Sequence, residues 1–425
     1  MKSALGFLIA AKRCEIHGLE QLEITCGLVQ GVGELVHMLQ KERGAANGYL
    51  ASRGGRFAAL RGERVAASIA AQQAVCERFD RLATEPARMA GGVRLFNRIA
   101  WVLHGLAELP ALRRRIEAFG PSPAQATASY SELIAGLLAV VFEAADTAVD
   151  PAISRALVGL FNFMQGKELA GQERALGAAV FAAGQLAAAE QPRLLHLIDA
   201  QERCFQLFVE FADATLQRIW RNAQSVPEAA ELERMRRIAN AAPIGRPVPD
   251  LSDRWFACAS ARIDAMRQVE DCATQGLLQL CEAKLAAARA DLCDHKRIFE
   301  TVAVPGSLPA TAMAVLLDPA GSGLAAPGGD GLGPPLGRSV LDLMQTQAQR
   351  LQAMGDELQA ARAALNERKV VERAKGLLMA SRGLSEEEAY RLLRQTAMNQ
   401  NRRLVEVAEA TLSLAEVLRG GGGQG

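Results

Sequence analysis

The sequence places an arginine where a helix should present a leucine. Along residues 32–50, apolar side chains recur every three or four positions, which is the spacing of one face of an α-helix, and Arg43 lies on that face. A guanidinium removed from water needs an anionic or hydrogen-bonding partner. Its planar fork donates parallel hydrogen bonds that suit a small planar oxyanion. The alternative is that Arg43 pairs with neighbours of Glu42 or with an acidic residue on a facing helix, and only stabilises the bundle.

Catalytic and metal-binding chemistry has no comparable signal. The 8 cysteines and 5 histidines are scattered singly, without a CxxC pair or a zinc-ligand spacing. There is also no P-loop, G-x-S-x-G or G-x-G-x-x-G motif. We therefore expect no catalytic residues, no metal and no cofactor, and we expect the thiols to be reduced. The formal net charge of +1 indicates neither a nucleic-acid nor a membrane partner by itself.

The chain is expected to be soluble and cytoplasmic. No stretch reaches the apolar length of a membrane-spanning helix. The apolar run at residues 4–11 is followed at once by Lys12 and Arg13, with no convincing cleavage site.

Residues 1–302 are predicted to form a long all-helical domain. They are rich in Ala, Leu, Glu, Arg and Gln and lack the alternating Val/Ile/Thr runs of strands. Prolines such as Pro110 and Pro151 are expected to divide this region into helices and loops. Because 50% of the 425 residues are hydrophobic, the chain can bury a sizeable core in two or more folded units.

The composition changes after this domain. Residues 303–337 are rich in Pro, Gly and Ala and are predicted to be a flexible linker. Residues 338–365 carry a heptad seam, which predicts a short coiled-coil helix and a parallel dimer. A single amphipathic helix that packs against its own chain is the alternative. Residues 366–420 are predicted to form three short helices, the first ending at Gly383 and the second beginning with a Ser385 capping box.

Two parts of the sequence resemble known families. The segment VVERAKGLLMASRGLSEEEAYRLLRQTAMNQNRRLVEVAEATL closely resembles the ANTAR domain, an RNA-binding module of bacterial antitermination regulators. ELVHMLQKERGAANGYLASRG resembles the nitrate- and nitrite-sensing NIT domain, as do, less strongly, FNFMQGKELAGQERALGAAVFAAG and WFACASARIDAMRQVED. The resemblance implies an all-α protein in which two stacked helical bundles bind nitrate or nitrite. It also implies a carboxy-terminal module that binds two hairpins in leader mRNA and prevents terminator formation.

The NIT resemblance bears directly on the arginines. The KERGA match favours ligand binding by Arg43, and the family pattern uses an arginine on a late helix opposite the first. In ELERMRRIANAAP, Arg236 lies on or beside the buried stripe and is the predicted second arginine, with Arg237 as the competitor if the register differs by one.

A further arginine, Arg174, belongs to the segment GQERALGAAVF, which echoes QKERGAANGYL. The echo indicates two related half-bundles or close helix packing, so Arg174 is either a structural counterpart or a second polar contact. We rank it below Arg236 because the nearby Lys167 and Glu168 indicate a solvated network.

The ANTAR resemblance selects the candidate RNA contacts. Lys375 and Arg394 are predicted to contact hairpin phosphates or loops, with Arg373 and Arg402 next. RNA loops expose unstacked bases, on which a guanidinium can stack and to whose edges it can donate hydrogen bonds. A solvated basic face is the alternative. Tyr390 is the only aromatic residue of this module and belongs either to its core or to the RNA-facing surface.

Together these features predict a homodimeric, nitrate- or nitrite-responsive transcription antiterminator without enzymatic activity. We expect the sensor to hold the carboxy-terminal helices until ligand favours their release. The alternative is a signalling adaptor that senses another small anion or a partner protein.

Overall fold

The computed structural model describes residues 4–55, 57–84, 92–148, 150–183, 190–241 and 249–302, and then 358–359, 367, 369–384, 386–400 and 402–420. The predicted linker at 303–337 lies outside the described residues, and so does the predicted coiled coil at 338–365 apart from 358–359. Within the described ranges the regular secondary structure is entirely α-helical. This confirms the predicted all-α fold.

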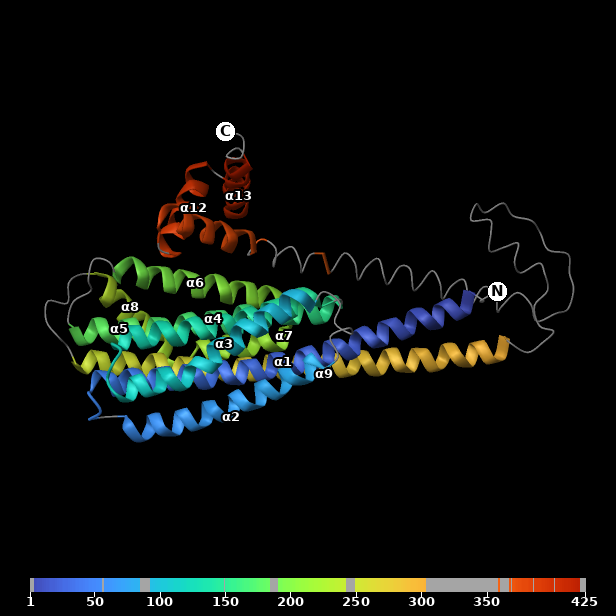
Figure 1. Ribbon diagram of the computed structural model, residues 1–425, viewed down its shortest axis with the longest axis horizontal. Coiled ribbons are helices and arrows are strands. Elements are labelled where there is room, and N and C mark those ends of the chain that lie inside the picture. Colours follow the sequence, from blue (N-terminus) through green and yellow to red (C-terminus); the bar gives the residue numbers. More distant parts are fainter. Residues whose placement is uncertain are drawn as a thin grey trace, which may run out of the picture.

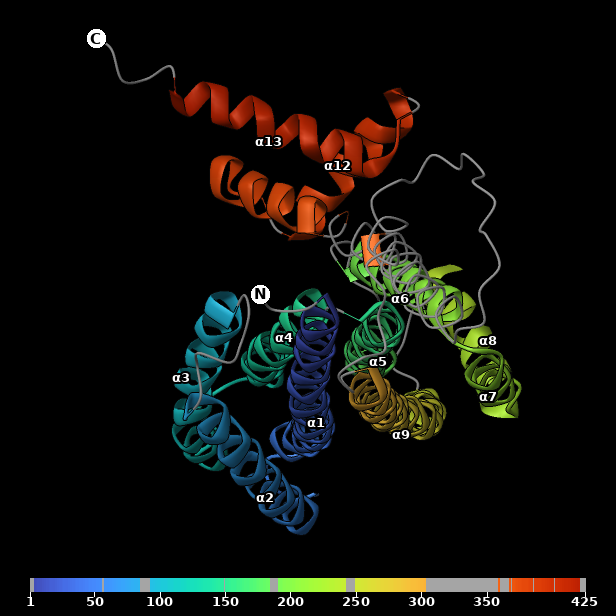
Figure 2. The same cartoon turned by 90° about the vertical axis from the view of Figure 1, so that its right-hand side faces the viewer.

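The amino-terminal part consists of two helical bundles that lie side by side (Figures 1 and 2). The first contains α1 (Ala4–Ala51), α2 (Ala58–Ala83), α3 (Gly92–Glu117) and α4 (Pro123–Thr147). The second contains α5 (Pro151–Ala183), α6 (Glu190–Phe211), α7 (Ala214–Gln224), α8 (Pro227–Ala241) and α9 (Pro249–Val302). The helices α1, α5 and α9 contact one another and form the seam between the bundles.

The apolar stripe predicted along α1 is buried. Val32, Leu35 and Leu39 have no exposed surface and belong to a core that continues into α2, α3 and α4. A smaller core joins α5, α6, α7 and α9 around Phe163 and Trp220. The face of α1 that carries Arg43 therefore lies deep in the protein.

The prolines act differently from one another. Pro110 lies inside α3, so the expectation that it ends a helix was wrong. Pro123 and Pro151 are the first residues of α4 and α5, where the missing N–H of proline has no cost. Ser122 caps α4 through a capping box with Gln125.

The helix α4 also corrects the expectation about membrane-spanning length. Its segment Pro123–Asp146 is long and apolar enough to cross a membrane. However, 61% of its most apolar window is buried inside the protein, where α4 packs against α1, α3 and α5. The apolar character of α4 is that of a core helix.

The carboxy-terminal module is a three-helix bundle, as predicted. Residues 369–382 are helical and end at Gly383, which has a φ of 64°. They are followed by α12 (Glu386–Gln400) and α13 (Leu404–Gly420), and the predicted cap Ser385 lies outside the described residues. The core of the module comprises Ala374, Leu378, Ala389, Leu393, Ala397, Val407 and Ala408.

One buried group gives the fold a pH dependence. His37 of α1 is 4% exposed, and its burial, together with the nearby Lys167 and Lys41, lowers its pKa to about 2. An unfolded histidine titrates near pH ~6.5, so below that pH the unfolded chain binds a proton that the folded chain excludes. The contribution of His37 is therefore neutral above that pH and becomes destabilising as the pH falls.

We predict that His37→Leu makes folding less sensitive to acid. Lowering the pH from ~7.5 to ~5.5 should reduce the free energy of unfolding by about 1.4 kcal/mol more in the natural protein than in the variant. Urea unfolding followed by circular dichroism at both pH values measures the difference. Equal losses in the two proteins would contradict the assignment.

Candidate functional site

Arg43 lies at the seam between the two bundles, and its side chain is 2% exposed. Its Nη1 donates to Oγ of Ser131 on α4 at 2.7 Å. The guanidinium also faces Glu168 of α5, with Nη1 at 2.5 Å from Oε1 and Nη2 at 3.2 Å from Oε2. The facing acidic residue that was considered as the structural alternative is therefore present.

The carboxylate of Glu168 is surrounded by donors. Nε2 of Gln40 on α1 donates to Oε2 at 2.9 Å, and Nε2 of Gln172 on α5 donates to Oε1 at 3.0 Å. With the two bonds from Arg43, three side chains converge on one planar anion. Charge-assisted bonds of this kind are about twice as strong as neutral ones.

Arg174 reaches the same seam from α5. Its Nη1 donates to Oγ of Ser260 on α9 at 3.0 Å, and its guanidinium lies 5.0 Å from the ring centre of Phe256. Among the residues that the structure describes, no carboxylate forms an ion pair with Arg174. Burial and the positive charge of Arg43 lower the pKa of Arg174 to about 10, so it is still a cation at neutral pH.

Two glycines allow the arginines to approach. A β-carbon on Gly171 of α5 would lie 2.6 Å from Nη2 of Arg43, and one on Gly44 of α1 would lie 3.1 Å from Nη2 of Arg174. Each arginine thus packs over a glycine of the opposite helix. The two segments that share a Glu-Arg pair thus pack against each other.

The reason for ranking Arg174 below Arg236 was wrong. Lys167 and Glu168 were expected in a solvated network, but they are 0% and 2% exposed. Lys167 pairs with Glu270 of α9, and burial lowers the pKa of Lys167 although Glu270 partly offsets this effect. Arg174 lies in the same buried seam as these two residues.

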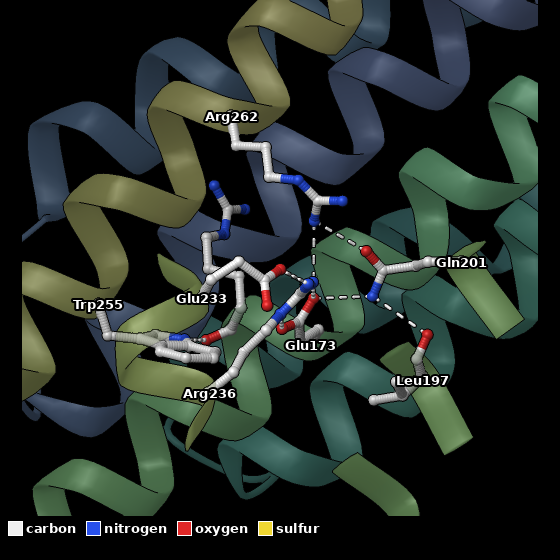
Figure 3. A network of polar contacts seen from close by, with 8 residues as sticks. Glu173, Leu197, Gln201, Glu233, Arg236, Trp255 and Arg262 are labelled. Atoms are coloured by element: carbon white, nitrogen blue, oxygen red, sulfur yellow. Dashed lines mark hydrogen bonds and ion pairs between the residues drawn. The ribbon is translucent and has the colours of Figure 1, made fainter. Parts of the chain in front are cut away.

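Arg236 belongs to a neighbouring network (Figure 3). Its Nε and Nη2 donate to the two carboxylate oxygens of Glu173 on α5, each at 2.6 Å, and its Nη1 pairs with Glu233 on α8. Arg262 of α9 lies 3.7 Å from Glu173 and donates to Gln201 at 2.9 Å. In this network two arginines face two glutamates.

The register predicted for α8 is correct, because Arg236 is 8% exposed whereas Arg237 is exposed. Arg236 and Arg43 nevertheless use different carboxylates of α5. Glu168 and Glu173 are five residues apart, which turns their side chains by about 140° around the helix. The structure therefore brings Arg43 together with Arg174.

Comparison with known proteins identifies the family of this chain. Residues 34–278 match the NIT family, which is described as nitrate and nitrite sensing. The chain belongs to the NIT family. Residues 359–412 match the ANTAR domain. The nitrate regulatory protein of Klebsiella oxytoca is 34% identical over 409 residues, which cover 96% of this chain and 94% of that protein.

A solved structure supports the same family. The structure of the NasR transcription antiterminator shares 32% sequence identity and a TM-score of 0.60, over 97% of this chain and 98% of that one. With a NIT sensor followed by an ANTAR domain, this chain is a nitrate-responsive antitermination regulator. Both matched families are regulatory, one for sensing and one for RNA binding.

The predicted RNA contacts of the ANTAR domain differ in exposure. Arg373, Arg394 and Arg402 are exposed. Lys375 is only 6% exposed, and its Nζ donates to both carboxylate oxygens of Glu372 at 2.9 Å. Exposure thus gives no support for ranking Lys375 first, and in this arrangement it must be uncovered before it can reach RNA.

The ANTAR domain contacts the NIT domain through α12 and α6. The ring of Tyr390 lies 5.4 Å from that of His196, and the guanidinium of Arg203 lies 4.9 Å from the Tyr390 ring centre. Nη1 of Arg394 is 3.0 Å from Oδ2 of Asp199. The sequence left open whether Tyr390 is core or RNA-facing, and here it faces the sensor.

Sequence reasoning missed the buried carboxylates that hold the arginines. It placed Glu168 in a solvated network instead of opposite Arg43. It also missed Glu42, which is fully buried and accepts hydrogen bonds from Arg113 of α3 at 2.8 and 2.9 Å. A signal was present, because small residues lie close to both glutamates: residues 44–46 are Gly-Ala-Ala after Glu42 and Arg43, and Gly166, Ala170 and Gly171 lie within three residues of Glu168. Such small residues let helices approach closely, and charges among them are removed from water.

We predict that the two carboxylates on Arg236 contribute unequally to stability. Glu173→Ala leaves buried Arg236 and Arg262 without their shared carboxylate and should cost about 3 to 5 kcal/mol. Glu233 is 57% exposed, so Glu233→Ala should cost no more than about 1 kcal/mol. Chemical denaturation of the two variants measures the difference, and similar losses would contradict this reading of the network.

Proposed function

We propose that nitrate or nitrite binds at the seam between α1 and α5, where Arg43 and Arg174 meet, and that binding releases the ANTAR domain to bind leader mRNA hairpins. Bound to the hairpins, the ANTAR domain prevents terminator formation. The observation that carries the ligand site is the surplus of positive charge. Arg43 and Arg174 face one buried carboxylate, that of Glu168, because Asp264, which also attracts Arg174, is exposed to solvent. One added monoanion would therefore balance the buried charges of the two arginines.

Arg236 is less suited to be the primary ligand. Its guanidinium is already bonded to Glu173 and Glu233, and the positive charge of Arg262 is offset by the same pair. An anion entering this network would bring two carboxylates close to a third negative charge. We therefore assign Arg236 to the support of the sensor, and Arg237 to its surface.

The contacts of the ANTAR domain with the sensor support a docked, sequestered state. Arg394, one of the predicted RNA contacts, is engaged with Asp199 of α6. Lys369 adds an ion pair to Asp146 of α4 at 2.6 Å and lies 5.3 Å from the ring centre of Phe142. Arg394 cannot bind RNA and Asp199 at once. In this proposal nitrate binds the released state more tightly than the docked one, and the ratio of the two affinities sets the switch.

The dimer completes the proposed mechanism. A parallel coiled coil at residues 338–365 would present two ANTAR domains to two hairpins, and joining two weak contacts raises their combined affinity without new contacts. The protein would act in the cytoplasm, with nitrate or nitrite as its effector and without a cofactor.

Replacing Arg43 tests the ligand site. We predict that Arg43→Gln, which keeps a donor for Glu168 but loses the charge and the fork, weakens nitrate binding by about 100-fold or more, because two charge-assisted hydrogen bonds are lost. Isothermal titration calorimetry measures the affinity, with chloride and sulfate as control anions. The exposed Arg237→Gln is the matched variant and should bind like the natural protein. Unchanged binding in Arg43→Gln would exclude the site.

Reversing a charge on α6 tests the docked state. Asp199→Lys places a lysine beside Arg394 and should shift the docking equilibrium by about 1 kcal/mol, or roughly fivefold, toward release. Gel-shift titration of a leader hairpin without nitrate should then show tighter binding. Glu210→Lys makes the same charge change at an exposed position of the same helix, about 16 Å further along its axis, and should have no effect. Equal binding by both variants would contradict sequestration.

A further inference from the structure

We infer that Glu168 is a resident competitor for the ligand: in the ligand-free protein its carboxylate occupies the place of the anion, and nitrate binds by displacing it from Arg43. The inference rests on the proposed site and deepens it, because it names the group that sets the affinity of that site. Glu168 then has a regulatory role in addition to its contribution to packing.

The geometry around Arg43 leaves no second position for an incoming anion on the same edge. Both terminal nitrogens of the guanidinium bond to Glu168, and Nη1 also donates to Ser131. A planar anion that uses this fork must therefore take the position of the glutamate. Nitrate, nitrite and carboxylate all present an edge of two oxygens that shares one negative charge, so the donors fit each of them.

The other donors favour the same exchange. Gln40 and Gln172 each direct an amide nitrogen at the carboxylate, at 2.9 and 3.0 Å, and both amides can bond to any oxygen placed there. Arg174 lies across the seam with no ion-pair partner among the described residues. The exchange thus adds a monoanion close to Arg174, which forms no ion pair in the part of the chain that the structure describes and is attracted by Asp264 and Glu168 from a distance.

This arrangement also predicts which anions compete. The donors of Arg43, Gln40 and Gln172 surround a planar monoanion, so nitrite and formate should displace Glu168 as nitrate does. Chloride has no two-oxygen edge, and sulfate is tetrahedral and doubly charged. A resident carboxylate keeps the affinity of the site moderate, because each ligand must first break an existing charge-assisted pair.

The inference is tested by removing the charge of the competitor while keeping its shape. Glu168→Gln in the full-length protein should bind nitrate about tenfold more tightly by calorimetry, which corresponds to about 1.4 kcal/mol. The nitrate concentration needed for hairpin binding should fall by the same factor. Glu42→Gln is the matched control, since Glu42 is an equally buried carboxylate held through two bonds by Arg113. Glu42→Gln should leave the nitrate affinity within about twofold of the natural value, because Glu42 does not bond to the side chains that are proposed to bind nitrate.

A second measurement keeps the test independent of the folding of the variant. In the natural protein, nitrate should change the carboxylate stretching bands in an infrared difference spectrum, and ¹⁵N-nitrate identifies the bands of the ligand itself. The carboxylate change should be absent in Glu168→Gln. A merely structural ion pair would give no carboxylate change.

The outcomes separate the inference from the proposed site. If Arg43→Gln abolishes binding but Glu168→Gln binds no better than the natural protein, or the carboxylate bands stay constant, the site stands and the displacement is wrong. If Arg43→Gln binds normally, the proposed site itself fails. A gain of affinity in Glu173→Gln and none in Glu168→Gln would place the anion at Arg236 and overturn the inference.

Discussion

The burial of charge along α5 is the constraint on which the sensor depends. This helix contacts α1, α4, α6, α8 and α9, so its ionised side chains must find partners on its neighbours. Three of them form ion pairs with residues of three other helices: Lys167 with Glu270 of α9, Glu168 with Arg43 of α1, and Glu173 with Arg236 of α8. Among the described residues, Arg174 makes one neutral hydrogen bond, to Ser260, and one aromatic contact, with Phe256. The helix that joins the two bundles is thus also the one that carries the unbalanced charge.

The sequence was informative wherever the signal was local. Helical periodicity identified the buried stripe of α1, the choice of Arg236 over Arg237 and the core of the three-helix module, because each depends on the face of a single helix. The partner of Arg43 depends on which helix packs opposite, and Glu168 is 125 residues away. Periodicity contains no such information. Charged neighbours also misled the ranking of Arg174, since a run of charges indicates solvation only when the helix has a free face.

The contact between the two domains differs from the sensor core in its energetics. Arg394 and Asp199 are both about half-exposed, at 53% and 44%, and such pairs contribute about 1 kcal/mol or less. The buried pair of Arg43 and Glu168 lies at the other extreme, since breaking one partner of such a pair costs about 3 to 5 kcal/mol. A weak interface beside a strongly held core is what a reversible switch requires. A modest difference in ligand affinity between two states is then enough to change which state dominates.

The helix α6 connects the sensor core with the domain interface, because its two faces contact different partners. One face packs on α5: Phe205 and Phe208 lie 5.5 and 4.7 Å from Phe163, measured between ring centres, and Gln201 donates to Glu173 at 2.7 Å. The other face presents His196 and Asp199 to the ANTAR domain. Close-packed side chains leave little room for α5 and α6 to move independently. In the proposed mechanism, a shift of α5 on exchange of its carboxylate for a free anion would therefore be carried to the docking face, without any contact between ligand and ANTAR domain.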